Sequence, residues 1–212
     1  LNINIEGFKN KAFVGQDSYT AGYIAGKLMH LSTPKAASFL IVQANHKITT
    51  NKAVANRIKG FNDYFKKNNS NSKAQIVRIE NLNNSSETKE ILNSYLKENS
   101  EIEGIFVPSR RIHRIVDCLY PVFLQKLKLI GFDNTPQNIE CLKNDAVSFL
   151  ISQKPFDQGY ESVRIMTDYL RTKEELTKKS LFLPIDILTK ENVDYNERKE
   201  IAFEKQHLNN FF

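Results

Sequence analysis

Apolar and polar positions alternate in blocks along the chain, and the blocks have the lengths of strands and helices. Short, continuous apolar runs are typical of strands that are buried on both faces of a sheet. Such runs lie at 12–17, 37–43, 74–81, 103–109, 127–133, 146–152 and 180–189. Apolar residues at helical spacing, typical of amphipathic helices, lie between them at 18–31, 51–68, 85–99, 110–122 and 155–172.

This strand–helix alternation predicts right-handed βαβ units and a mostly parallel sheet with helices on both faces. We find no internal repeat and no low-complexity linker, so any domain boundary lies in a short connection. The best candidates are 31–36 ("LSTPKA") and 151–155 ("ISQKP"). The helix at 155–172 carries Val163, Met166 and Leu170 on one stripe, which indicates lobe packing or a dimer face.

The composition is that of an ordinary globular protein and narrows the function by exclusion. The 212 residues carry a net charge of +6, but Lys and Arg are mixed with acids and no nucleic-acid-binding motif is present. The two cysteines and four histidines show no disulfide framework or metal-ligand spacing. No apolar run is long enough for a membrane span. No GxSxG, P-loop or GxGxxG motif is present, so we expect no enzyme activity and no cofactor.

One strand ends on an acid. The stretch "LKLIGFD" closes on Asp133, directly before the turn residues "NTP". Ligands of open α/β sheets bind at the carboxyl ends of the strands, so Asp133 is a candidate ligand contact. Alternatively, the carboxylate caps the helix that follows the turn.

The order of these motifs resembles the ligand-binding core of the LacI/GalR family of transcriptional regulators, which the type 1 periplasmic sugar-binding proteins share. The motifs that carry the resemblance are "FVGQDSYTAGYIAGKLM", "NRIKGFNDYF", "EGIFVPS", "LKLIGFDNTPQNIECL" and "VSFLISQKPFDQGYESVRIM", together spanning about 12–189. The resemblance implies a periplasmic-binding-protein-like type I α/β fold. It has two Rossmann-like lobes with parallel sheets, joined by three crossing strands, with the ligand clamped between them.

The resemblance also implies that the first lobe is incomplete. The chain begins at Leu1, so a helix-turn-helix head and most of the first lobe would precede it. We expect 1–33 and 153–173 to be a remnant of the N-terminal lobe, and 34–150 with 180–190 to form the C-terminal lobe. The charged, amide-rich segment 191–212 reads as a surface-lying or partly disordered tail.

Four positions match the family's ligand contacts: Asp17, Arg57, Asp133 and Gln153. Carboxylates accept from sugar hydroxyls, and an arginine fork donates to two oxygens. We expect Asp133 to pair with Arg57, whose charge would otherwise be buried alone. Asp17 has the alternative role of capping the helix at 18–31, and Arg57 that of a surface charge.

The chain departs from the family at Ser109 and Arg110, where many members have Asn-Asp. Arg110 replaces an acid by a base, which admits an acidic or phosphorylated sugar unless the side chain turns into solvent. Weaker candidates are Asn45, His46 and Lys47 in the polar loop.

The sequence therefore predicts the effector-binding domain of a cytoplasmic LacI-type regulator. It would bind a sugar or sugar derivative, form a homodimer, and reach operator DNA through the absent helix-turn-helix, with no membrane partner. The alternative is an extracytoplasmic sugar-binding protein that serves a transporter or a sensor kinase.

Overall fold

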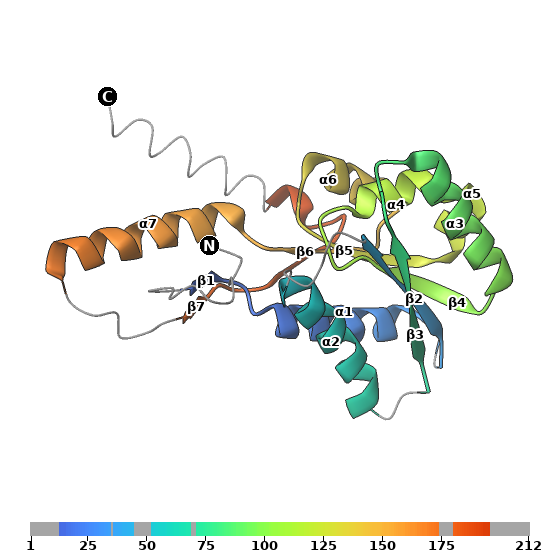
Figure 1. Cartoon of the computed structure of the whole chain (residues 1–212), viewed down its shortest axis with the longest axis horizontal. Coiled ribbons are helices and arrows are strands. Elements are labelled where there is room, and N and C mark those ends of the chain that lie inside the picture. Colours follow the sequence, from blue (N-terminus) through green and yellow to red (C-terminus); the bar gives the residue numbers. More distant parts are fainter. Residues whose placement is uncertain (1–12, 35, 45–51, 69–70, 174–179, 196–212) are drawn as a thin grey trace.

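The computed structural model describes residues 13–34, 36–44, 52–68, 71–173 and 180–195. Its elements alternate between strand and helix along most of the chain, as Figure 1 shows. They are β1 (Phe13–Gly15), α1 (Ser18–Ser32), β2 (Ser38–Ala44), α2 (Lys52–Lys67), β3 (Lys73–Ile79), α3 (Ser85–Glu98), β4 (Ile102–Phe106), α4 (Ile112–Cys118), α5 (Pro121–Lys126), β5 (Lys128–Phe132), α6 (Pro136–Lys143), β6 (Phe149–Ser152), α7 (Pro155–Thr172), β7 (Ser180–Phe182) and β8 (Asp186–Leu188).

Two sheets lie side by side along the long axis of the molecule (Figure 1). The larger has six strands in the order β3-β2-β4-β5-β6-β8, all parallel except that β8 runs antiparallel to β6. The smaller consists of β1 and β7, paired in parallel. The predicted α/β class with mostly parallel sheets is therefore confirmed, and the described residues form one large and one small sheet.

The large sheet is buried on both faces, which explains its continuous apolar strands. Along β2, the side chains of Phe39 and Ile41 join the core beneath α1 and α2, whereas Leu40 and Val42 join the core beneath α3, α4 and α6. Because neighbouring residues of a strand point to opposite faces, both sides of the sheet need apolar side chains.

Helices α1 and α2 pack unusually closely because each offers a glycine to the other. A Cβ on Gly22 would lie 2.0 Å from the carbonyl oxygen of Arg57, and one on Gly60 would lie 2.1 Å from the carbonyl oxygen of Tyr19. This close contact fixes how α2 is placed along α1, and it therefore fixes the position of Arg57 on α2.

Helix α1 does not belong with the small sheet, although the predicted division grouped 1–33 with the first lobe. It packs on α2 and contributes Ala21, Ala25 and Met29 to the core of the large sheet. The connection from the small to the large sheet therefore lies before α1, at Gln16 and Asp17.

The predicted strand at 180–189 is two strands that belong to different sheets. Strand β7 pairs with β1, and β8 pairs with β6. Pro184, which has no N–H to donate, lies between them. The predicted helix at 110–122 is likewise divided, because Pro121 begins α5 after an extended residue at Tyr120.

Only the first part of the predicted tail lies within the described residues. There, Val193 is fully buried in the core beneath α3, α4 and α6, whereas the other residues of 191–195 are exposed. This part of the segment therefore lies on the surface and is anchored by one apolar side chain. Positions 196–212 lie outside the described residues.

We predict that Gly22→Ala destabilises the protein by about 1–3 kcal/mol or more, because its Cβ meets backbone and cannot be relieved by a rotamer change. Gly159→Ala is the matched control: nothing lies within 4 Å of its Cβ, and in α7 it should stabilise by up to about 1 kcal/mol. Denaturant unfolding measures both. Equal free energies of unfolding for the Gly22 variant and the wild type would contradict the close contact.

Candidate functional site

The centre of the candidate site is Arg57, a buried cation at the carboxyl end of the large sheet. Arg57 and Phe61 share one face of α2, since they are one helical turn apart. Phe61 stacks on Phe106 of β4, with ring centroids 4.5 Å apart, and the Arg57 guanidinium lies 3.9 Å from the ring centroid of Phe132 of β5. Packing of α2 on the sheet thus carries Arg57 to the strand ends with 5% of its surface exposed.

Gln153 connects Arg57 to Asp133. Its side-chain oxygen accepts from Nη2 of Arg57 at 2.5 Å, and its Nε2 donates to Oδ1 of Asp133 at 2.6 Å. The other terminal nitrogen of Arg57, Nη1, donates to the carbonyl oxygen of Pro108 at 3.0 Å. The predicted pairing of Arg57 with Asp133 is therefore mediated by an amide, and we call these three side chains the Arg57–Gln153–Asp133 relay.

The backbone at Asp133 places its carboxylate toward the relay. Asp133 has a φ of 69°, in the left-handed region that Asp and Asn tolerate best among residues with a side chain. The helix after the turn, α6, is capped by Thr135, whose hydroxyl accepts from the backbone N–H of Asn138. The capping alternative for Asp133 is thus wrong, and its carboxylate is available to the relay.

Burial shifts the pKa values of both charged groups of the relay toward their neutral forms. Desolvation lowers the pKa of Arg57 to about 10, and the charge of Asp133 opposes that shift. Burial also raises the pKa of Asp133, against the hydrogen bond from Gln153 and the charges of Arg57 and Arg110. The positive charge of Arg57 and the negative charge of Asp133 therefore each favour the ionised form of the other, against the effect of burial.

Asp17 caps α1 and also faces a pocket. Its Oδ1 accepts from the backbone N–H groups of Tyr19 and Thr20 at 3.0 and 3.3 Å, and its Oδ2 accepts from the Thr20 hydroxyl at 2.6 Å. The pocket has a volume of about 220 Å³ and lies between the small sheet and the start of α2. Its lining residues are Phe13, Gln16, Asp17, Ser18, Lys52, Ala53, Asn56, Ser180 and Phe182. Both predicted roles of Asp17 are thus compatible in this geometry.

The remaining predicted residues are placed unequally. Ser109 is half-buried just after β4, and Arg110 is exposed but close enough for its charge to lower the pKa of Asp133. Asn45, His46 and Lys47 lie outside the described residues.

Three polar residues of the site were missed by the sequence analysis. Asn138 is fully buried, and its amide donates to the carbonyl oxygens of Arg110, Phe132 and Asp133, which ties the ends of β4 and β5 together. Gln16 and Asn56 line the pocket. Their positions, directly before Asp17 and Arg57, were the signal that could have found the last two.

Two buried polar atoms in the described part of the chain have no hydrogen-bond partner: Nε of Arg57 and Oε1 of Gln16. Gln16 lines the pocket between the small sheet and α2, and Arg57 follows Asn56, which lines the same pocket. Buried polar groups without a protein partner are rare, and each costs free energy unless a polar atom of solvent or a ligand meets it.

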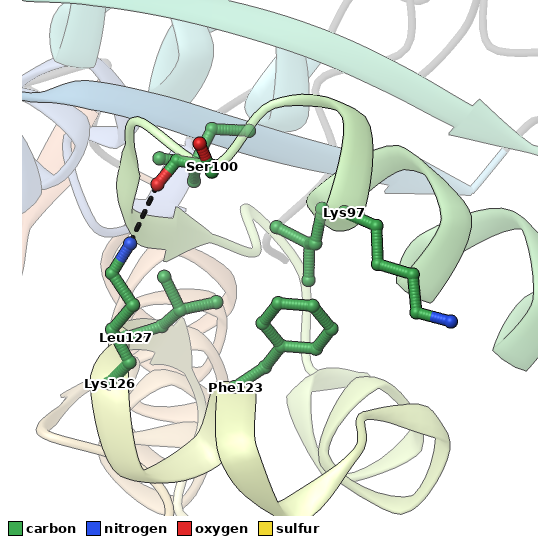
Figure 2. A pocket seen from close by; sticks show the side chains of 7 residues that line it. Lys97, Ser100, Phe123, Lys126 and Leu127 are labelled. Carbon is green, nitrogen blue, oxygen red and sulfur yellow. Dashed lines mark hydrogen bonds between the residues drawn. The ribbon is translucent and has the colours of Figure 1, made fainter.

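A second pocket lies at the opposite end of the large sheet and contains none of the predicted site residues. It has a volume of about 200 Å³ between the end of α3 and α5. Figure 2 shows Phe123 and Leu127 in its wall, while Nζ of Lys126 donates to the carbonyl oxygen of Ser100 at 2.7 Å. Because this pocket lies at the amino ends of the strands and the relay at their carboxyl ends, the two sites are separate.

Two further properties of the described residues bear on function. No three His, Cys, Asp or Glu side chains among them gather closely enough to hold a metal ion. Within the same residues, no helix has the length and apolar character needed to cross a membrane.

We predict that Arg57→Met raises the pKa of Asp133 further, because it removes a positive charge and keeps most of the buried volume. A raised carboxyl pKa gives stability that is complete below the ordinary value near 4 and is lost as the pH rises through the folded-state pKa. The loss should therefore extend to higher pH in the variant. Carbon-13 NMR titration of the Asp133 carboxyl measures the shift. Arg164→Met, an exposed arginine in an ion pair with Glu161, is the control, and an unchanged Asp133 pKa in Arg57→Met would contradict the relay.

The solved structures with this arrangement of elements include a candidate regulator and several sugar-binding proteins. A candidate LacI transcriptional regulator from Bacteroides fragilis superposes with a TM-score of 0.77 at 26% identity, covering 92% of this chain and 67% of that one. GanP, a glucose-galactose binding protein from Geobacillus stearothermophilus, gives 0.70 at 21% identity, with 89% and 66% covered. A mutant of the XylFII–LytSN complex gives 0.68 at 27% identity, with 91% and 74% covered.

The chain spans about two thirds of the length of the first two of these structures, 67% and 66%. A search of curated proteins by sequence finds no match. The sequence pattern of the periplasmic binding protein domain, however, matches residues 2–174, which is most of the chain. The chain therefore belongs to the periplasmic binding protein domain family.

Proposed function

We propose that the cleft between the two sheets binds a sugar or sugar derivative through Asp17, Arg57, Asp133 and Gln153. The observation that carries this proposal is the Arg57–Gln153–Asp133 relay, which is polar and largely buried. The relay residues themselves do not line the pocket of about 220 Å³, but Asp17 and Asn56, the chain neighbour of Arg57, do. Side chains held this rigidly can accept from and donate to neighbouring hydroxyls without first losing conformational entropy.

The unpaired Nε of Arg57 supports the same role. A guanidinium has five N–H donors, and here the two described hydrogen bonds use Nη1 and Nη2. A ligand oxygen placed beside Nε would accept from the one guanidinium nitrogen that has no hydrogen-bond partner, and it would place a partial negative charge next to the buried guanidinium. The gain would be that of a hydrogen bond to a charged group, about 1.5–3 kcal/mol.

The charges of the cleft favour a polar ligand with hydroxyls over a strongly anionic one. Asp17 and Asp133 present carboxylates, while Arg57 already has Asp133 opposite it. Two described cations could turn to an acidic substituent: Lys52, which lines the pocket, and Arg110, which is exposed and lies toward Asp133. Sugar acids and sugar phosphates therefore belong in the same screen as neutral sugars.

For the whole protein, we propose the effector-binding domain of a LacI-type regulator. It would be cytoplasmic and homodimeric, and it would act on operator DNA through a helix-turn-helix that precedes this sequence. The structural similarity to the Bacteroides fragilis regulator supports this proposal. Ligand binding would shift the relative stability of two lobe arrangements by no more than its differential affinity for them.

The second candidate is an extracytoplasmic sugar-binding protein of a transporter or a sensor kinase. The similarity to GanP and to AraP, an arabinose binding protein from Geobacillus stearothermophilus, favours it. The upstream coding sequence discriminates the two: a helix-turn-helix supports regulation, and a signal peptide supports transport. Sedimentation of the full-length protein adds an independent test, since the first predicts a dimer and the second a monomer.

We predict that a thermal-shift screen of pentoses, hexoses, sugar acids and sugar phosphates finds at least one stabilising ligand. Asp133→Asn should weaken that ligand's affinity about 10- to 100-fold, because it removes a charged acceptor while keeping the shape and the left-handed backbone. Asp117→Asn, at an exposed position of α4, is the control and should leave the affinity unchanged. Wild-type affinity in the Asp133 variant, or no hit with the full-length protein, would refute the proposed site.

A further inference from the structure

Three short connections join the small sheet to the large one, and they run together through the middle of the molecule (Figure 1). The first is Gln16 and Asp17, between β1 and α1; the second is Gln153 and Lys154, between β6 and α7; the third is 183–185, between β7 and β8. Any movement of one sheet against the other must bend all three.

One side chain ties these connections together. Gln16, in the first connection, is 2% exposed, and its Nε2 donates to the carbonyl oxygen of Ser152 at 2.5 Å and to that of Pro184 at 3.1 Å. Ser152 directly precedes the second connection, and Pro184 is in the third. Because both neighbours are carbonyl oxygens, the amide nitrogen must face them, which fixes the orientation of the side-chain amide.

Backbone contacts around Gln16 add to this arrangement. The N–H of Leu183, in the third connection, donates to the carbonyl oxygen of Gly15, the residue before Gln16, at 2.9 Å. Lys154 and Asp186 form an ion pair at 2.7 Å between the second connection and the start of β8. The Gln16 amide is the buried centre of the group.

Gln16 also lies between the two halves of the candidate ligand site. Its chain neighbour is Asp17, and the carbonyl that it holds belongs to the residue before Gln153. On its other side, Gln153 is held by Gln158, whose Nε2 donates to the Gln153 carbonyl oxygen at 2.5 Å. Gln16 therefore holds the backbone just before Gln153 through its side chain, and its own backbone leads directly to Asp17. In this way it sets the distance between Asp17 and Gln153.

We propose that Gln16 is a positioning residue that sets the relative placement of Asp17 and Gln153 by holding the three connections in register. As far as its effect on ligand binding is concerned, this inference rests on the proposed function. The orphaned Oε1 of Gln16 gives the arrangement a cost. The two donations from Nε2 reach carbonyl groups in two other segments and are lost if the connections move apart, so the Gln16 amide favours the present arrangement of the connections.

The test is Gln16→Met, which keeps the length of the side chain and removes both donors. In the variant, the backbone N–H of Leu183 should exchange with solvent at least about 10-fold faster, because the opening of the connections becomes easier. The side-chain NH₂ resonance of Gln153 should shift, since its backbone is no longer held. Amides at the centre of the large sheet, such as that of Ile130 in β5, should keep their wild-type exchange rates.

Gln125→Met, at an exposed position of α5, is the matched control and should change neither signal. If Gln16→Met fails to fold, Gln16→Asn serves instead, because a side chain one methylene shorter cannot reach both carbonyl oxygens. Wild-type Leu183 exchange and an unshifted Gln153 resonance would overturn the inference, as would an acceleration spread evenly over both sheets.

These readouts need no sugar, so they are independent of the proposed function. With a sugar found by screening, Gln16→Met should also weaken binding about 10-fold, whereas Gln125→Met should not. Faster exchange at Leu183 without a sugar hit would contradict sugar binding and leave the positioning role established. Unchanged sugar affinity alongside faster exchange would overturn the link from Gln16 to the site.

Discussion

The burial of one positive charge constrains the rest of this structure. Arg57 lies on the ring of Phe132 with 5% of its surface exposed, and a guanidinium in such a place is costly unless its donors are matched. The carbonyl of Pro108, the amide of Gln153 and the nearby charge of Asp133 provide that match. These groups come from three separate segments of the chain. The Arg57 charge is therefore compensated only when those segments have come together around it.

The helices that bring those segments together pack so closely that there is no room for a larger side chain at two positions. Gly22 and Gly60 let α1 and α2 touch backbone to backbone, and Phe61 on Phe106 fixes α2 against the sheet. The small sheet contrasts with this precision. Within the described residues it has two strands, and α7 leaves Val163, Met166 and other apolar residues exposed, while Gln158 is the one residue of α7 that is buried. The relay therefore belongs to the part of the molecule in which the described residues pack most closely.

Much of this arrangement followed from the sequence, and the remainder has identifiable physical reasons. Continuous apolar strands and helical stripes were enough for the α/β fold, because burial on both faces of a sheet leaves a strong signal. The relay differed in detail: charge pairing was expected between Arg57 and Asp133, but Gln153 lies between them. The roles of Gln16 and Asn138 depend on carbonyl groups far away in the chain, and no local pattern records such partners. The grouping of α1 with the first lobe differed because sequence order does not show which sheet a helix covers.

The most direct measurement is the nitrogen-15 resonance of the Arg57 Nε–H group with and without a saturating sugar, assigned by its loss in Arg57→Lys. The account places a ligand oxygen beside this buried, unpaired donor. It therefore predicts a large downfield shift of the Nε proton and slower exchange with solvent when the sugar binds. A sugar that binds tightly and leaves this resonance unchanged would contradict the claim that the relay forms the ligand site.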